Sequence, residues 1–176
     1  KLTDWNWDLS TNYGTNSLDY RTSNSVNVTL GNASPTAFSD GQLKFNQMAQ
    51  TGYRLVDLCG YDESGQDLYA AIWEQSPGPA WQAFHGLDAT QYQSRFSQLA
   101  AQGYLPHRVS GYTVGGVQRY AAIWQQRTSI GWQARHGIDA ATYQRAFDDA
   151  LYQGYQLRQV CGYATPAGPR FAALWD

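Results

Sequence analysis

Two histidines occupy equivalent places in this sequence, each followed by glycine, in the steps His85-Gly86 and His136-Gly137. Histidine is the usual general base near neutral pH, so both are candidates for chemistry. No nucleophilic residue keeps step with them, and together with His107 they match no spacing typical of a metal site. We therefore expect no catalytic residue, metal or cofactor, and retain His85 and His136 as structural or ligand-binding residues.

Tryptophan is the second residue type that could bind a ligand, because aromatic faces stack on sugar rings and dock peptides. Trp81 and Trp132 are equivalent to each other, which favours packing but leaves ligand binding open. Trp5 and Trp7 fall outside this pattern, and their i, i+2 spacing would place both on one face of a strand. All four are candidates for binding a glycan or an extracellular peptide, and Trp5 and Trp7 could equally cover a strand edge.

The composition excludes several classes of protein. The chain has 176 residues, with 12 Lys+Arg against 14 Asp+Glu, 7 Trp and 13 Tyr. Disordered chains are charge-rich and aromatic-poor, nucleic-acid-binding proteins carry a basic patch, and membrane spans need about 18 or more consecutive apolar residues. None of these features is present, so we expect a soluble globular domain that binds neither nucleic acid nor membrane.

An internal repeat of 51 residues connects the candidate residues. Its anchors are two Gly-Tyr steps, one tryptophan and one phenylalanine in each copy, namely Gly52/Gly103/Gly154, Gly60/Gly111/Gly162, Trp73/Trp124/Trp175 and Phe45/Phe96/Phe147. A fixed period of this size indicates one supersecondary unit used repeatedly. Most shared residues then serve packing, and function is expected where the copies differ or where their assembly creates a site.

The third copy shows what the unit is. The segment 132–137 is typical of a strand, Asp139 of a helix N-cap, and Gly154 of a helix end. Strands over 155–163 and 170–175 follow, so the unit is β-α-β-β. The second copy repeats this pattern with Asp88 as its cap. The first copy is degenerate at its start, with a helix expected from about Ser39.

These units predict an α+β fold with antiparallel sheets and helices outside. We expect one domain over 26–176, with repeats at about 26–75, 76–126 and 127–176. Residues 1–25 lie outside the repeat and are expected to form a terminal cap, with one strand near Trp5–Leu9.

Two cysteines bear on how the repeats assemble. Cys59 and Cys161 stand 102 residues apart, twice the repeat period, where the second copy has Ser110. In an open stack they would lie on the order of 20 Å apart, too far for a disulfide. We expect a Cys59–Cys161 disulfide and hence a closed pseudo-threefold arrangement, the alternative being two small buried thiols.

Several features are typical of a secreted protein. Lysine occurs only at Lys1 and Lys44, and the sequence holds glycosylation sequons at Asn27 and Asn32, the second weakened by Pro35. The absence of an apolar leader after Lys1 fits a mature form or a piece of a longer protein. We expect an extracellular glycoprotein.

A family resemblance follows from the repeated run Trp-Gln-Ala-x-His-Gly-x-Asp-Ala and the closing run [Tyr/Phe]-Ala-Ala-[Ile/Leu]-Trp. This pattern resembles the bacterial tandem-repeat family and the N-terminal repeats of fungal polyglycine hydrolases, whose catalytic serine lies elsewhere, in a Ser-x-x-Lys motif. The chain contains no Ser-x-x-Lys. The resemblance implies an accessory or binding module. The aromatic content alone makes carbohydrate or cell-wall material the expected ligand. The alternatives are part of a serine hydrolase acting on glycine-rich peptides, or a self-associating structural protein.

Overall fold

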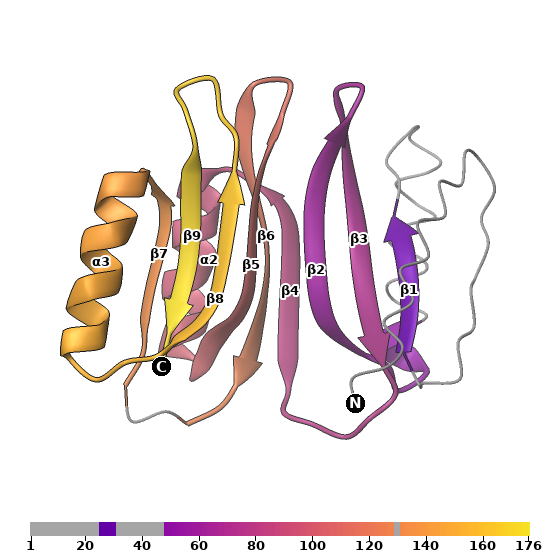
Figure 1. Cartoon of the computed structure of the whole chain (residues 1–176). Helices are drawn as coiled ribbons and strands as arrows, with labels where there is room; N and C mark the ends of the chain where they lie inside the picture. The colour runs from indigo at the N-terminus through magenta and orange to yellow at the C-terminus, as the bar shows by residue number, and fades with distance from the viewer. Residues whose placement is uncertain (1–24, 31–47, 129–130) are drawn as a thin grey trace, which may run out of the picture.

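The computed structural model describes residues 25–30, 48–128 and 131–176 (Figure 1). Within them, each repeat forms one three-stranded antiparallel sheet. In order across each sheet, the strands are β1 (Ser25–Leu30), β3 (Gln66–Glu74) and β2 (Arg54–Glu63); β4 (Trp81–Leu87), β6 (Val117–Gln126) and β5 (Tyr104–Val114); and β7 (Gln133–Ile138), β9 (Arg170–Trp175) and β8 (Leu157–Tyr163). Helix α2 (Ala89–Ala101) follows β4 and helix α3 (Ala140–Tyr152) follows β7. The predicted α+β fold of β-α-β-β units is confirmed.

The helices begin and end where the sequence predicts. The Asp88 carboxylate accepts a hydrogen bond from the Gln91 N–H at 2.8 Å, and the Gln91 side chain accepts one from the Asp88 N–H at 3.0 Å. Asp139 caps α3 in the same way, through the Thr142 N–H at 2.8 Å. Each carboxylate satisfies an N–H that has no partner inside the helix.

The three sheets pack face to face, and each buries the alternate side chains of its neighbour. Leu55, Leu58, Tyr69, Ala71 and Trp73 of the first sheet form one core with Tyr112, Ala121 and Ile123 of the second. Val109, Tyr120, Ala122 and Trp124 of the second sheet form another core with Ala172 and Leu174 of the third. Because strand side chains alternate in direction, a central sheet of this kind is buried on both faces.

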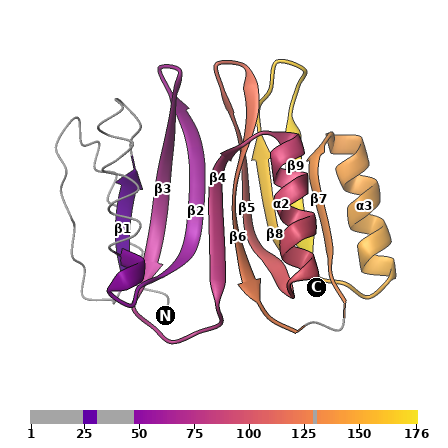
Figure 2. The same ribbon diagram turned by 180° about the vertical axis from the view of Figure 1, so that it is seen from behind.

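Helix α2 lies across the side of the second sheet that Figure 1 hides and Figure 2 shows. Its buried residues Tyr92 and Leu99 belong to the core between the second and third sheets. Its Phe96 contacts Trp132 of the third repeat, with ring centroids 5.4 Å apart. Strands β5 and β8 meet directly, as β2 and β5 do. The contact between the second and third repeats therefore has two parts. Helix α2 packs on the third repeat in one part, and β5 packs against β8 in the other.

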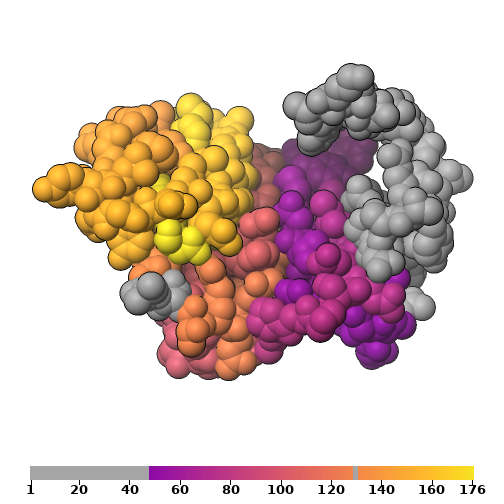
Figure 3. Space-filling view, turned by 60° about the horizontal axis from the view of Figure 1, so that its bottom comes forward, coloured from indigo at the N-terminus to yellow at the C-terminus, as the bar shows by residue number. Residues whose placement is uncertain are grey.

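The repeats follow one another in chain order, with the first and third at opposite ends of the array (Figures 1 and 3). Among the described residues, the extensive contacts between sheets join the first to the second and the second to the third. The predicted closed ring is not confirmed. In this described part no helix has the length and apolar character needed to cross a membrane.

The predicted cap over 1–25, apart from Ser25 at the start of β1, lies outside the described residues. The same holds for the strand at Trp5–Leu9, the residues Trp5, Trp7 and Asn32, and the helix start at Ser39. Asn27 lies in β1, opposite Ile72 of β3.

Candidate ligand-binding site

One shallow cavity of about 510 Å³, widely open to solvent, is assembled from all three repeats. Its walls are equivalent segments of β2, β5 and β8 with their hairpin turns: residues 59–62, 110–113 with Gly116, and 161–166. A volume of this size suits a small-molecule site or part of a chain. No single repeat contains this site, so it is a feature that only the assembly creates.

Tyrosines build the contacts between successive repeats beside this cavity, and we refer to these contacts as joints. The Tyr112 ring lies directly on Gly60, and its hydroxyl is 2.9 Å from the Tyr69 hydroxyl. The Gly86 N–H also donates to the Tyr112 hydroxyl at 3.2 Å. Burial raises the pKa of Tyr69 and Tyr112, so both hydroxyls stay protonated and uncharged.

The joint between the second and third repeats has the same design. The Tyr163 ring lies on Gly111, and its hydroxyl is 2.9 Å from the Tyr120 hydroxyl. Glycine is required at both places because a β-carbon would overlap the tyrosine ring. Of the two recurring Gly-Tyr steps, the one at Gly60 and Gly111 therefore serves the contacts between repeats.

Three equivalent residues, Cys59, Ser110 and Cys161, line the cavity together. The Gly60 N–H donates to the Ser110 hydroxyl at 3.1 Å, and the Cys161 thiol donates to the Gly111 carbonyl oxygen at 3.5 Å. Burial raises the pKa of Cys161, and the nearby Cys59 raises it further. Because the thiolate is the reactive form, Cys161 is a poor nucleophile at neutral pH.

The predicted Cys59–Cys161 disulfide is wrong for this structure, in which both cysteines are free thiols. The equivalent positions do converge on one cavity, as the prediction required. However, β5 packs against both β2 and β8, and it engages the Cys161 thiol with a backbone carbonyl. Cys59 is exposed.

The two predicted histidines lie in the joints between repeats. His85 packs on Tyr69 of the first repeat, with centroids 4.4 Å apart, and His136 packs on Tyr92 of the second at 4.6 Å. Burial lowers the pKa of both histidines. They are uncharged packing groups at neutral pH and do not line the cavity.

The two described tryptophan candidates also lie in the joints. Trp81 packs edge-on against Trp73 of the first repeat, with centroids 5.9 Å apart. Trp132 packs instead on Phe96 of helix α2, the contact described above, and it also lines the smaller pocket described below. Both are half-buried, and neither lines the cavity shared by the three repeats.

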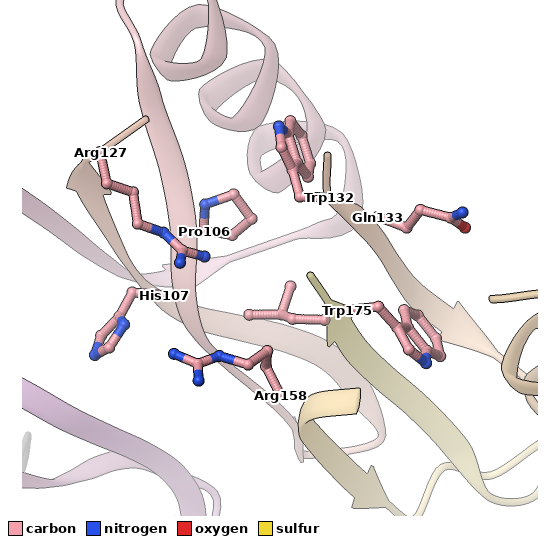
Figure 4. Close-up of a pocket in the computed structure, with 8 residues that line it drawn as sticks. Pro106, His107, Arg127, Trp132, Gln133, Arg158 and Trp175 are labelled. Atoms are coloured by element: carbon pink, nitrogen blue, oxygen red, sulfur yellow. The ribbon is translucent and has the colours of Figure 1, made fainter. Parts of the chain in front are cut away.

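A second, much smaller pocket lies at the opposite ends of the strands from the hairpins, where Arg127 and Arg158 point toward one space beside His107 (Figure 4). The Asp176 carboxylate pairs with Arg127 at 2.9 Å and with Arg158 at 3.2 Å. Burial and the surrounding arginines lower the pKa of His107 to about 4. The pocket measures about 10 Å³, which is about the space of one water molecule.

Sequence reasoning missed this arginine cluster because Arg127 and Arg158 do not stand at equivalent positions of the repeat. It also missed Tyr61, Tyr112 and Tyr163 as cavity residues, although the recurring Gly-Tyr step was their signal. Asp62 is the one charged residue among those that line the cavity. The described residues hold no group of three histidine, cysteine or acidic side chains suited to a metal ion. The lining therefore offers aromatic, hydroxyl and thiol groups, and hardly any charge.

Fold and site together define a tandem-repeat α+β protein whose cavity is shared between repeats. The model of one protein family, described as a polyglycine hydrolase-like structural repeat, matches the chain three times, over residues 39–76, 78–127 and 129–176. The chain belongs to this family, which confirms the resemblance seen in the sequence.

Proposed function

We propose that this repeat array is a non-catalytic binding or accessory module, and that the cavity shared by the three repeats is its ligand site. The observation that carries the proposal is the cavity itself, which all three repeats build and whose lining is almost uncharged. The residues with catalytic potential support it indirectly, since His85 and His136 pack in joints and the pKa of Cys161 is raised.

The lining is uncharged apart from Asp62, and its exposed surface is largely apolar with a few hydroxyl groups. We propose that it binds a neutral ligand that stacks on an aromatic ring, namely carbohydrate or cell-wall material. Tyr112 and Tyr163 are held in the joints, whereas Tyr61 is half-buried on the cavity wall. A half-exposed tyrosine offers a ring face for stacking and a hydroxyl for hydrogen bonding. Thr113 and Thr165 add hydroxyl groups to the same cavity.

We also propose that the protein acts outside the cell. With the disulfide absent, this proposal rests on the low lysine content and on the sequons at Asn27 and Asn32. We expect glycosylation at Asn27 in a eukaryotic secretory host, with less at Asn32 because of Pro35. Intact mass before and after enzymatic deglycosylation measures it, and an unchanged mass would remove the sequon argument.

The family description favours a second candidate function. A polyglycine hydrolase-like repeat could serve a hydrolase by holding its glycine-rich substrate. A chain of glycines is also neutral, polar and narrow, so the same cavity could accept it. This function differs from the first in the ligand alone.

The deciding experiment is a binding screen of the whole chain against a glycan array and a set of oligoglycine peptides. We expect binding to glycans and a loss of at least about tenfold in Tyr61→Ala, since one stacking contact contributes on the order of 1 kcal/mol or more. Tyr152→Ala is the matched control, because Tyr152 is 94% exposed on α3.

Binding to oligoglycine alone would instead support the second function. An equal loss of ligand affinity in Tyr61→Ala and Tyr152→Ala would contradict the cavity as the binding site. Absence of binding to both glycans and oligoglycine would contradict it too. Labelling of this chain by a covalent serine-hydrolase probe would contradict a non-catalytic role.

A further inference from the structure

In the joints inside the array, one face of a repeat binds a tyrosine ring of the next repeat. Gly60 of the first repeat is covered by the Tyr112 ring of the second, and Gly111 of the second by the Tyr163 ring of the third. Both glycines are buried as a result. In each case an extended strand of the following repeat presents the aromatic ring.

The third repeat carries the same face without a following repeat on it in the structure. Gly162 is exposed, although its equivalents Gly60 and Gly111 are buried. Val160 is 45% exposed, whereas its equivalents Leu58 and Val109 are 7% and 1% exposed. An apolar surface that is covered twice in the array is therefore open at its third occurrence.

A pocket of about 450 Å³ lies at this exposed glycine. We refer to it as the third-repeat seat, and its lining is Gly162, Tyr163, Ala164, Thr165, Gly168, Pro169 and Phe171. The seat shares Gly162 to Thr165 with the cavity between the repeats, but Gly168, Pro169 and Phe171 belong to the seat alone.

We propose that the third-repeat seat binds an aromatic side chain presented by an extended polypeptide segment of a partner. The two internal joints carry this inference, because they show such a ring seated on the equivalent glycine within this same chain. The proposal does not depend on the function proposed for the cavity.

One residue difference between repeats bears on whether the seat distinguishes tyrosine from phenylalanine. Phe171 stands where the first and second repeats have Tyr69 and Tyr120, whose hydroxyls bond to the incoming tyrosine at 2.9 Å. Phe171 has no hydroxyl, so a tyrosine placed on the seat finds no such partner there. The seat is accordingly a site for phenylalanine and tyrosine alike.

The test is a titration of the ¹⁵N-labelled full chain with a synthetic peptide of residues 105–114, the segment that presents Tyr112 to Gly60. Two further peptides carry phenylalanine or alanine in place of this tyrosine. We expect the tyrosine and phenylalanine peptides to shift the Gly162 amide signal with affinities within about twofold, because ring burial is common to both. The alanine peptide should bind at least about tenfold more weakly.

Two variants of the protein sharpen the test. Gly162→Ala puts a methyl group where the ring would lie and should weaken both aromatic peptides at least about tenfold. Phe171→Tyr restores the missing hydroxyl and should tighten the tyrosine peptide by about two- to tenfold while leaving the phenylalanine peptide unchanged. Val117→Ala is the control, since Val117 is also an exposed valine, at 51%, and lies in a different hairpin.

Equal binding of the alanine peptide, or no shift of Gly162 up to millimolar peptide, would overturn the proposal. If Gly162→Ala does not fold, Phe171→Tyr still tests the proposal. A Phe171→Tyr protein that binds the tyrosine peptide no more tightly than the wild type does would also overturn the proposal. Phe171 lines the seat but not the cavity between the repeats, so the Phe171→Tyr result is independent of glycan binding, whereas Gly162 belongs to both. Concentration-dependent self-association that Gly162→Ala abolishes would support the seat, with a second copy as the partner.

Discussion

At the scale of single residues, three glycines at equivalent positions have different roles because their neighbours differ. Gly60 and Gly111 support tyrosine rings, whereas the nearest atom to a β-carbon at Gly162 would be Phe171 Cε1 at 3.2 Å. A phenylalanine ring at a half-exposed site can move by a few tenths of an ångström, but a ring buried in a joint cannot.

We therefore expect Gly111→Ala to lower the free energy of unfolding by about 1–3 kcal/mol, the usual range for overpacking a core. Gly162→Ala should change it by less than about 1 kcal/mol, since the neighbouring ring can yield. Chemical denaturation of both variants measures the difference. Equal destabilisation would show that the two glycines do not differ in their surroundings as the structure indicates.

His107 predicts how stability depends on pH. Its pKa is lowered from 6.5 to about 4, first by burial and then by Arg108, Arg127, Arg158 and Arg54. Between these two pH values the unfolded chain binds a proton that the folded chain does not, so stability falls as pH decreases through this window and is fully present above it. Burial lowers the pKa of His85 and His136 too, which adds to the effect with the same sign.

Replacing His107 with glutamine should therefore flatten the dependence of the free energy of unfolding on pH between about 6.5 and 4. Urea denaturation of the wild type and His107→Gln at several pH values gives the two slopes. Tyr152→Ala, on the exposed face of α3, controls for mutation as such and should keep the wild-type slope. Identical slopes in His107→Gln would contradict the role assigned to His107.

At the scale of elements, the sequence predicted most of what the structure contains. Asp88, Asp139 and the helix-ending glycines Gly103 and Gly154, with φ of +79° and +86°, fix the helix boundaries. These signals act over a few residues along the chain, so they can be recognised without the tertiary structure. The same holds for strand β9, which spans the predicted 170–175.

The cap of α2 offers a direct test at this scale. Asp88→Ala removes the acceptor of the Gln91 N–H and one half of the reciprocal bond pair, so it should cost about 1 kcal/mol of stability. Asp88→Asn retains an acceptor oxygen and should stay close to the wild type. Thermal or urea denaturation compares the three proteins, and an unchanged midpoint and slope in Asp88→Ala would contradict the assigned cap.

At the scale of the whole molecule, stability should be greatest in the middle of the array. Residues 120–125 of β6 are all buried, because a sheet packs on each face of the second repeat. Strand β8 alternates between half-buried and exposed residues, with Val160 45% exposed.

Hydrogen exchange should therefore be slowest in β6 and faster in β8, since exchange follows local opening and sparsely covered strands open at lower cost. Exchange followed by mass spectrometry with peptide resolution measures both strands in one experiment, and β5 serves as an internal reference within the second sheet. Faster exchange in β6 than in β8 would contradict the face-to-face stacking of the sheets.

The sequence by itself determined the repeat, the β-α-β-β unit, the helix caps and the family, because each of these depends on residues near one another in the chain or on their spacing. The tertiary structure decided which copy of a repeated residue is covered. Cys59 and Cys161 occupy the same position of the unit. Cys59 is exposed, whereas the Cys161 thiol donates a hydrogen bond to the Gly111 carbonyl oxygen of the preceding repeat. Gly162 has the sequence surroundings of Gly111, but among the described residues no tyrosine ring of another repeat covers it, and it is exposed. Burial, pairing and cavity formation depend on which unit packs against which, and a periodic sequence presents equivalent residues alike until those contacts are known.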